Sequence, residues 1–163
     1  MKANGIEVSV VRVAQNETVA LKEYAQNERV FVEAREGTEY QVRIRNDNAY
    51  RCMVVAAVDG LDVLNGEPAA KDGNGYIVNG MSSITIKGFR KSNEEVGAFK
   101  FVSKEKGYAT EKGEGANVGV ISVAVYREKQ KAPDPFIIWK DRIVERHIHH
   151  DHYWPNRPYW GDY

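Results

Sequence analysis

The sequence of 163 residues contains a single cysteine, Cys52. One cysteine cannot form a disulfide within the chain, and it excludes a zinc site built from several thiolates. Free cysteines are among the most often buried residues, so we expect Cys52 to be a small apolar side chain in the core. A chain of this length buries a sizeable core without disulfides, and we expect one main domain.

The sequence also lacks a long hydrophobic run. No segment approaches the ~18 consecutive apolar residues of a membrane-spanning helix, and residues 1–7 offer no apolar stretch of the kind that a secretory signal requires. We therefore expect synthesis and folding in a cytoplasm, and no membrane partner. A component of a virus particle that is assembled there and later released would have the same features.

An excess of charge of either sign is absent as well. The 23 Lys and Arg residues balance 23 Asp and Glu residues, which gives a formal net charge of zero. Proteins that are held to nucleic acid by their overall field are strongly basic. The balance therefore argues against a nucleic-acid partner.

No segment shows the sustained 3.6-residue periodicity of an amphipathic helix. Residues 40–45 instead alternate between apolar and charged side chains. This alternation predicts a half-buried antiparallel strand with Val42 and Ile44 in the core and Arg43 and Arg45 in solvent.

Further apolar segments separated by turn residues indicate about eight to ten short strands. Residues 52–58 are too apolar for an edge strand, and residues 118–126 are rich in β-branched side chains. Asp59-Gly60 and Asn65-Gly66 are typical hairpin turns. We predict an all-β fold over residues 1–127, specifically an antiparallel β-sandwich of the jelly-roll kind.

Two segments are less regular. Residues 18–22 fit either a second strand or a short helix, and the pattern leaves both possibilities open. Residues 104–115 are polar and contain three glycines, which predicts a long surface loop.

Recognisable catalytic sets are missing. Residues 113–119 are rich in glycine but lack the Gly-Lys-Ser/Thr ending of a phosphate-binding loop. Ser82 and Ser83 lie near a turn, but no nucleophile elbow surrounds them and every histidine lies near the C-terminus. We therefore predict that the protein is not an enzyme.

Three carboxylates, Asp59, Asp62 and Glu67, lie close together in the sequence beside two predicted turns. They could bind calcium or act as an acid–base pair. The Asp-Gly and Asn-Gly turns explain them more simply, because Asp and Asn side chains stabilise turns by bonding to nearby backbone groups.

Residues 128–163 differ in composition from the rest and form a proline-containing linker and a tail rich in histidine and aromatic residues. The four histidines of the chain gather there with one carboxylate, and imidazole and carboxylate groups bind zinc, nickel or copper. We expect no cofactor other than such a divalent metal. The candidate ligands are His147, His149, His150, Asp151 and His152.

The geometry of such a site depends on the backbone. On an extended strand His147, His149 and Asp151 would share one face, whereas on a helix His147 and Asp151 would lie one turn apart. A contact with a partner surface explains the cluster equally, and such a contact would respond to pH because histidine titrates near pH 6.5.

Every tryptophan also lies in the last 25 residues of the chain. Tryptophan and tyrosine are favoured anchors of protein interfaces, and prolines stiffen the segment for extended docking. The tail could dock on its own domain, on a neighbouring subunit or on a sugar. The candidate partner-binding residues are Trp139, Tyr153, Trp154, Tyr159 and Trp160.

Five segments together resemble an uncharacterised family of β-rich proteins from bacteria and their phages. They are residues 58–69 (Val-Asp-Gly-Leu-Asp-Val-Leu-Asn-Gly-Glu-Pro-Ala), 75–78 (Gly-Tyr-Ile-Val), 84–90 (Ile-Thr-Ile-Lys-Gly-Phe-Arg), 95–101 (Glu-Val-Gly-Ala-Phe-Lys-Phe) and 117–125 (Asn-Val-Gly-Val-Ile-Ser-Val-Ala-Val). The resemblance covers about residues 40–127 and implies a sandwich scaffold used in virus particles. It implies no catalytic residues.

We therefore expect a structural or interaction protein, such as a capsid-associated or decoration subunit of a phage, which assembles with copies of itself or on a capsid through its sandwich and its tail. An alternative is a carbohydrate-binding module, in which Tyr76 and Phe89 or the tail aromatics stack on sugar rings. A weaker alternative is a metal-binding protein that uses the histidine cluster.

Overall fold

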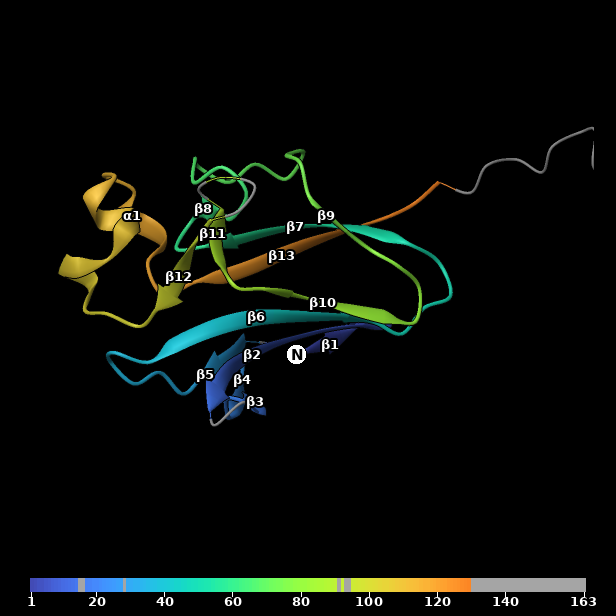
Figure 1. Cartoon of the computed structure of the whole chain (residues 1–163), viewed down its shortest axis with the longest axis horizontal. Helices are drawn as coiled ribbons and strands as arrows, with labels where there is room; N and C mark the ends of the chain where they lie inside the picture. The colour runs from blue at the N-terminus through green and yellow to red at the C-terminus, as the bar shows by residue number, and fades with distance from the viewer. Residues whose placement is uncertain (15–16, 28, 91, 93–94, 130–163) are drawn as a thin grey trace, which may run out of the picture. The chain divides into compact units, whose positions relative to one another are not determined.

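The computed structural model describes residues 1–14, 17–27, 29–90, 92 and 95–129. Contacts divide the chain into two units, Met1–Glu128 and Lys129–Tyr163. The fold described below is that of the first unit (Figure 1). None of the helices in the described residues is long and apolar enough to cross a membrane.

Thirteen strands in the described residues form three antiparallel sheets, which confirms the all-β prediction. The largest sheet contains β1 (Lys2–Ala3), β2 (Ile6–Ala14), β3 (Glu17–Ala20), β6 (Glu39–Asn46), β10 (Ser82–Ile86), β11 (Gly88–Arg90) and β12 (Val96–Lys100). The second contains β7 (Cys52–Val58), β8 (Leu61–Asp62), β9 (Tyr76–Val78) and β13 (Ile121–Arg127). The third is the hairpin of β4 (Glu23–Gln26) and β5 (Arg29–Val32).

One hydrophobic core joins the two larger sheets. Figure 1 shows β7 and β13 as one layer and β6 and β2 as another. Val42 and Ile44 of β6 are buried in this core, and the alternating Arg43 and Arg45 are exposed, as the sequence predicts. Side chains of β7 complete the core from the other layer.

The strand β7 lies inside its sheet, which confirms the prediction that it is too apolar for an edge. It pairs with β13 along one edge and with β8 and β9 along the other. Cys52, at the start of β7, is 1 % exposed and contributes to the core. The prediction that Cys52 is a small buried side chain is therefore confirmed.

The turn between β7 and β8 is the two-residue hairpin expected from Asp59-Gly60. Both residues have positive φ, 56° and 83°, which is the requirement of a type I′ turn. Aspartate and glycine tolerate this conformation better than other residues. The Asp59 carboxylate also accepts a hydrogen bond of 2.7 Å from the Gly119 backbone N–H, which ties the turn to the segment before β13.

A buried asparagine connects the ends of the two large sheets. Asn46, the last residue of β6, is fully buried. Its side-chain amide donates to the carbonyl oxygens of Tyr50 (2.8 Å) and Asn79 (3.1 Å), and its Oδ1 accepts from the Asn48 backbone N–H (3.0 Å). These bonds hold the 47–50 turn against the connection between β9 and β10, where the chain crosses from one sheet to the other.

Two predicted segments differ from the structure. Residues 104–115 are not a plain loop, because they include η1 (Lys104–Lys106) and the one-turn helix α1 (Tyr108–Glu111). The last strand begins at Ile121 rather than Val118, because η2 (Gly115–Asn117) and the positive φ of Gly119 interrupt the extended backbone. The undecided segment 18–22 belongs partly to β3, which pairs with β2.

Candidate interaction surfaces

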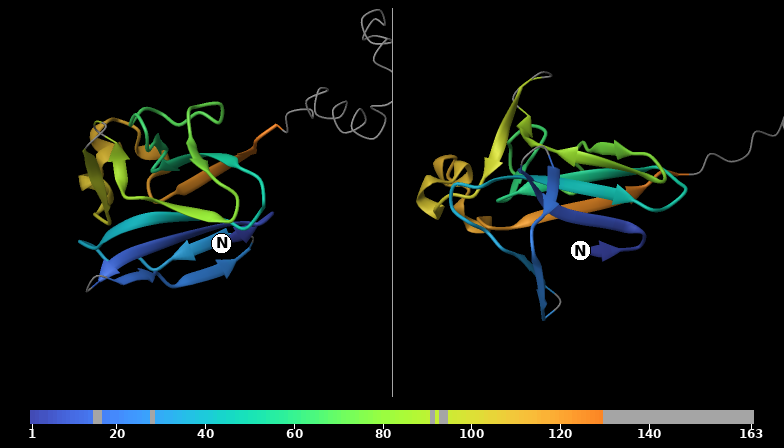
Figure 2. Two further views of the ribbon diagram at one scale, coloured as in Figure 1. Left: turned by 45° about the vertical axis from the view of Figure 1, so that its right-hand side comes forward. Right: turned by 60° about the horizontal axis from the view of Figure 1, so that its bottom comes forward.

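The β4–β5 hairpin is almost fully exposed to solvent. In the right-hand view of Figure 2 it extends away from both large sheets. Of its eight residues only Val32 is even partly buried. Its base is held by a hydrogen bond from the Leu21 N–H to the Val10 carbonyl (2.8 Å) and by Leu21 and Val32, which pack against the core.

Large apolar side chains of this hairpin are exposed to solvent. Tyr24 and Phe31 are opposite each other in the register and therefore share one face. Their exposed fractions are 47 % and 51 %, and Val30 on the other face is also exposed. The Lys22 ammonium lies 4.9 Å from the centre of the Tyr24 ring, a cation–π contact at the base of the same face.

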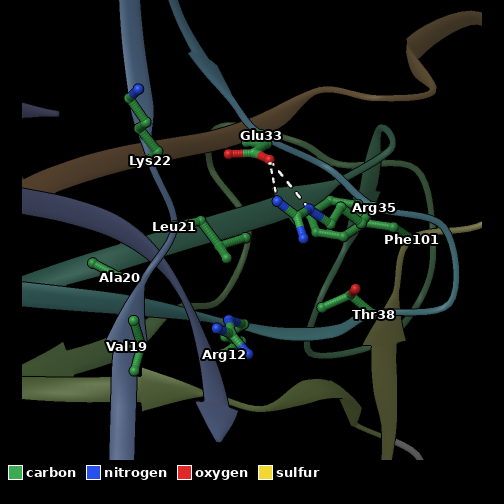
Figure 3. Close-up of a pocket in the computed structure, with 9 residues that line it drawn as sticks. All are labelled: Arg12, Val19, Ala20, Leu21, Lys22, Glu33, Arg35, Thr38 and Phe101. Atoms are coloured by element: carbon green, nitrogen blue, oxygen red, sulfur yellow. Dashed lines mark hydrogen bonds and ion pairs between the residues drawn. The ribbon is translucent and has the colours of Figure 1, made fainter.

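A hollow of about 300 Å³ lies beside the base of the hairpin (Figure 3). Its lining includes three cationic side chains, Arg12, Lys22 and Arg35, and one carboxylate, Glu33. Glu33 Oε1 accepts hydrogen bonds from Arg35 Nε (3.2 Å) and Nη2 (2.9 Å), so this pair is neutral. The hollow therefore keeps a positive charge, which favours a partner surface that carries carboxylates.

Five aromatic rings form a continuous row that starts at Phe101, in the lining of the first hollow. The Tyr40 ring stacks on Phe101 at 4.2 Å and on Phe99 at 5.4 Å between centroids. Phe89 packs edge-on against Phe99 at 5.1 Å and lies 5.2 Å from Tyr108. Burial raises the pKa of the Tyr40 hydroxyl above its usual range, and the nearby charge of Asp59 adds to the rise.

The row ends in a second hollow of about 510 Å³. Phe89 of β11 and Tyr108 of α1 line it together with Arg90, Lys100 and Lys106. Tyr108 is 44 % exposed, so one of the rings is open to a ligand. The combination of aromatic rings and polar groups in a concave surface is typical of small-ligand sites.

Of the two aromatics proposed to stack on sugars, only Phe89 lines this second hollow. Tyr76 is not in its lining, and the Arg90 guanidinium lies 5.7 Å from the centre of the Tyr76 ring. Tyr108 was not predicted, because its segment has the composition of a surface loop. The two short helical turns around it bring the ring to the hollow.

Each of the three neighbouring carboxylates has a structural partner. Asp62 is buried and its Oδ1 accepts the Leu64 backbone N–H at 2.7 Å. Asp59 accepts the Gly119 N–H, and Glu67 lies 3.7 Å from the Lys112 ammonium. No group of three metal-binding side chains occurs in the described ranges of the chain.

Ser82 and Ser83 both take part in the structure of β10. The Ser82 hydroxyl donates to the Asn79 carbonyl at 3.0 Å, and Ser83 is paired with Arg45 across β10 and β6. All four histidines fall outside the residues that the structure describes. The described residues therefore offer neither serine a histidine base.

The predicted tail sites lie outside the described residues. This applies to the partner-binding residues Trp139, Tyr153, Trp154, Tyr159 and Trp160, and to the metal ligands His147, His149, His150, Asp151 and His152. They remain predictions.

No protein-family model, no curated protein and no solved structure matches this chain.

Proposed function

We propose that the protein is a non-enzymatic structural subunit that assembles with copies of itself. In this proposal the first unit is an antiparallel β-sandwich of the jelly-roll kind, and its assembly surfaces are the β4–β5 hairpin and the C-terminal tail. The observation that carries the proposal is the hairpin, which exposes Tyr24 and Phe31 side by side.

The physical argument starts from the stability of the hairpin. A two-stranded hairpin is at best marginally stable alone in water, and the β4–β5 hairpin contacts the core only near its base. Aromatic side chains are also enriched at the centres of protein interfaces. A neighbouring subunit that covers the aromatic face of the hairpin would bury Tyr24 and Phe31 and would stabilise both strands.

The setting that we propose is a virus particle, in which the protein is a capsid-associated or decoration subunit synthesised in the cytoplasm of the host cell. The resemblance of residues 40–127 to phage and bacterial β-proteins supports this setting. The tail adds five aromatic anchors, which are suited to a neighbouring subunit or to a larger assembly.

Light scattering after size exclusion tests the proposal on the full chain and on a truncation that ends at Glu128. We expect the full chain to have a mass above the 18.4 kDa of one chain. A smaller oligomer of the truncation would assign part of the assembly to the tail. A monomeric full chain over a hundredfold range of concentration would contradict the proposal.

The hollow beside Phe89 and Tyr108 favours a second candidate function, the binding of carbohydrate. An exposed ring in a concave surface with cationic and amide neighbours can stack on a sugar and bond to its hydroxyl groups. A glycan array is the direct test, with the Tyr108→Ala variant as its control. Absence of binding to any glycan would remove this candidate.

The histidine cluster supports a third and weaker candidate, a metal-binding protein. Metal analysis of purified protein without a histidine tag tests it, with a variant in which His147, His149 and His150 are replaced by alanine as the control. Equal metal content in the two proteins would remove this candidate.

A further inference from the structure

The strand β13 presents one free edge within the described residues. It pairs with β7 over its whole length, from Ile121 opposite Val58 to Arg127 opposite Cys52, and with no other described strand. The ladder continues at both ends, because the Asp59 N–H bonds to the Val120 carbonyl (2.8 Å) and the Glu128 N–H bonds to the Arg51 carbonyl (3.2 Å).

The positions of these two terminal bonds define which backbone groups are free. In an antiparallel ladder alternate residues bond to the partner strand and the residues between them point away from it. Residues 120 and 128 bond to the β7 side, so the even-numbered residues between them do the same. The N–H and C=O groups of Ile121, Val123, Val125 and Arg127 therefore face the free edge.

Over residues 121–126 this edge lacks the devices that keep sheets apart, and the one charged residue of β13, Arg127, stands at its end. Natural edge strands carry lysine, proline, bulges or inward-pointing charges that prevent pairing with another chain. Residues 121–126 read Ile-Ser-Val-Ala-Val-Tyr, without a charge, a proline or a glycine. The register with β7 is continuous, so β13 carries no bulge.

Ile121 and Val123 of this strand pack against the core, but a third apolar side chain on the same face is largely uncovered. Val125 lies opposite Val54, which is fully buried, so both side chains point toward the core layer. Val125 is nevertheless 41 % exposed. A further strand beside β13 would cover it, because a strand added at an edge extends the apolar face of the sheet.

We propose that β13 pairs antiparallel with β13 of a second copy of this chain, across a twofold axis at Ala124. This inference rests on the proposed self-assembly and adds the β13 edge to the hairpin and the tail as a further interface. Both partners present the same free edge, and antiparallel pairing of identical strands is a self-complementary, closed contact.

The register with Ala124 at the axis is the one that pairs all seven residues of both strands. It places Val123 opposite Val125 of the second copy on the core face. It also places Tyr126 opposite Ser122, so a large ring meets a small side chain, and Ala124 opposite Ala124. The two Arg127 residues are then six positions apart along the ladder, roughly 20 Å, and do not repel each other strongly.

A disulfide at the axis tests this register in the full-length protein. In the proposed pairing Ala124 occupies a non-hydrogen-bonded position, where opposite Cα atoms are about 4.5 Å apart, within the range of a disulfide. We expect Ala124→Cys to form a covalent dimer under mild oxidation. The native Cys52 is buried, so the wild-type protein stays uncrosslinked.

The matched control is Ser122→Cys, on the same face of the same strand. Its two copies would be four positions apart, roughly 13 Å, and would not crosslink. Equal crosslinking of the two variants would indicate random collision and would overturn the register. An Ala124→Cys protein that stays oligomeric in light scattering but does not crosslink would also overturn the inference while leaving the proposed function intact.

A proline variant tests the free edge by a second route. The Val123 N–H faces away from β7, so Val123→Pro removes a donor of the free edge without breaking the β7 ladder. We expect a folded protein, by circular dichroism, with a lower mass than the wild type. A folded variant of unchanged mass would contradict edge pairing, and a wild-type protein that is monomeric at all concentrations would contradict the proposed function itself.

Discussion

Tyr24 and Phe31 lie directly opposite each other across the β4–β5 hairpin, and each leaves about half of its surface in water. Complete burial of such a side chain is worth roughly 1.5–3 kcal/mol, so covering the exposed halves would contribute about 1 kcal/mol for each ring. The isolated subunit, whose rings remain in water, does not gain this free energy. We therefore expect the proposed neighbouring subunit to cover this pair.

Replacing Asn46 by alanine should destabilise the protein by about 3 kcal/mol. The substitution removes the amide that satisfies the Tyr50 and Asn79 carbonyls at a fully buried position, and a buried group that loses its partner costs about 1–3 kcal/mol. Urea unfolding measures the change. Asn65→Ala is the control, because Asn65 is exposed and its side chain accepts a bond from the Glu67 N–H on the surface; a similar loss in both variants would refute the role of Asn46.

Gly88→Ala should be strongly destabilising. A Cβ atom at Gly88 would lie 2.0 Å from the Gly97 carbonyl oxygen on the paired strand β12. Relief of such an overlap requires a backbone shift, which costs about 1–3 kcal/mol or more. At Gly115 a Cβ would meet only the Thr110 hydroxyl at 3.8 Å, so Gly115→Ala serves as the control. Equal melting temperatures for the two variants would contradict this packing.

Alkaline unfolding should depend on Tyr40. Burial, assisted by the Asp59 charge, raises the pKa of Tyr40 in the folded protein above the ordinary value of 10.0. The unfolded chain therefore releases this proton first, and the stability present below pH 10.0 is lost as the pH rises toward the folded value. Tyr40→Phe lacks the proton and should lose less stability between about pH 9 and about pH 11. Urea unfolding at the two pH values gives the loss of unfolding free energy for each protein. Equal losses in the wild type and in Tyr40→Phe would refute the assignment.

Cys52 should not react with a thiol reagent while the protein is folded. It is buried in β7, and burial raises the pKa of its thiol and so lowers the thiolate fraction. We expect labelling at the rate of unfolding, with full reaction in denaturant. Rapid labelling of the native protein would contradict the burial of Cys52 at the start of β7.

The pattern of side chains predicted the parts of the fold that depend on local alternation. Val42 and Ile44 point inward because strand geometry alternates and the apolar residues alternate with it. The Asp59-Gly60 turn was predictable because few other residue pairs tolerate positive φ at both positions.

The features that depend on long-range pairing were not predictable. Nothing local to residues 76–78 and 82–86 indicates that β9 joins β7 while β10 joins β6. Nothing in the local pattern of residues 23–32 indicates that β4 and β5 form a separate sheet and expose Tyr24 and Phe31. Tyr108 reaches its hollow through short helical turns that a loop composition hides.

The mass of the Tyr24→Ser/Phe31→Ser double variant in light scattering, beside that of the wild type, tests the central claim most directly. The control is Ile77→Ser/Met81→Ser, which removes two exposed apolar side chains outside the hairpin. The account predicts a wild-type oligomer, an unchanged control and a hairpin variant of lower mass with the same circular dichroism. A folded hairpin variant with the mass of the wild type would contradict it.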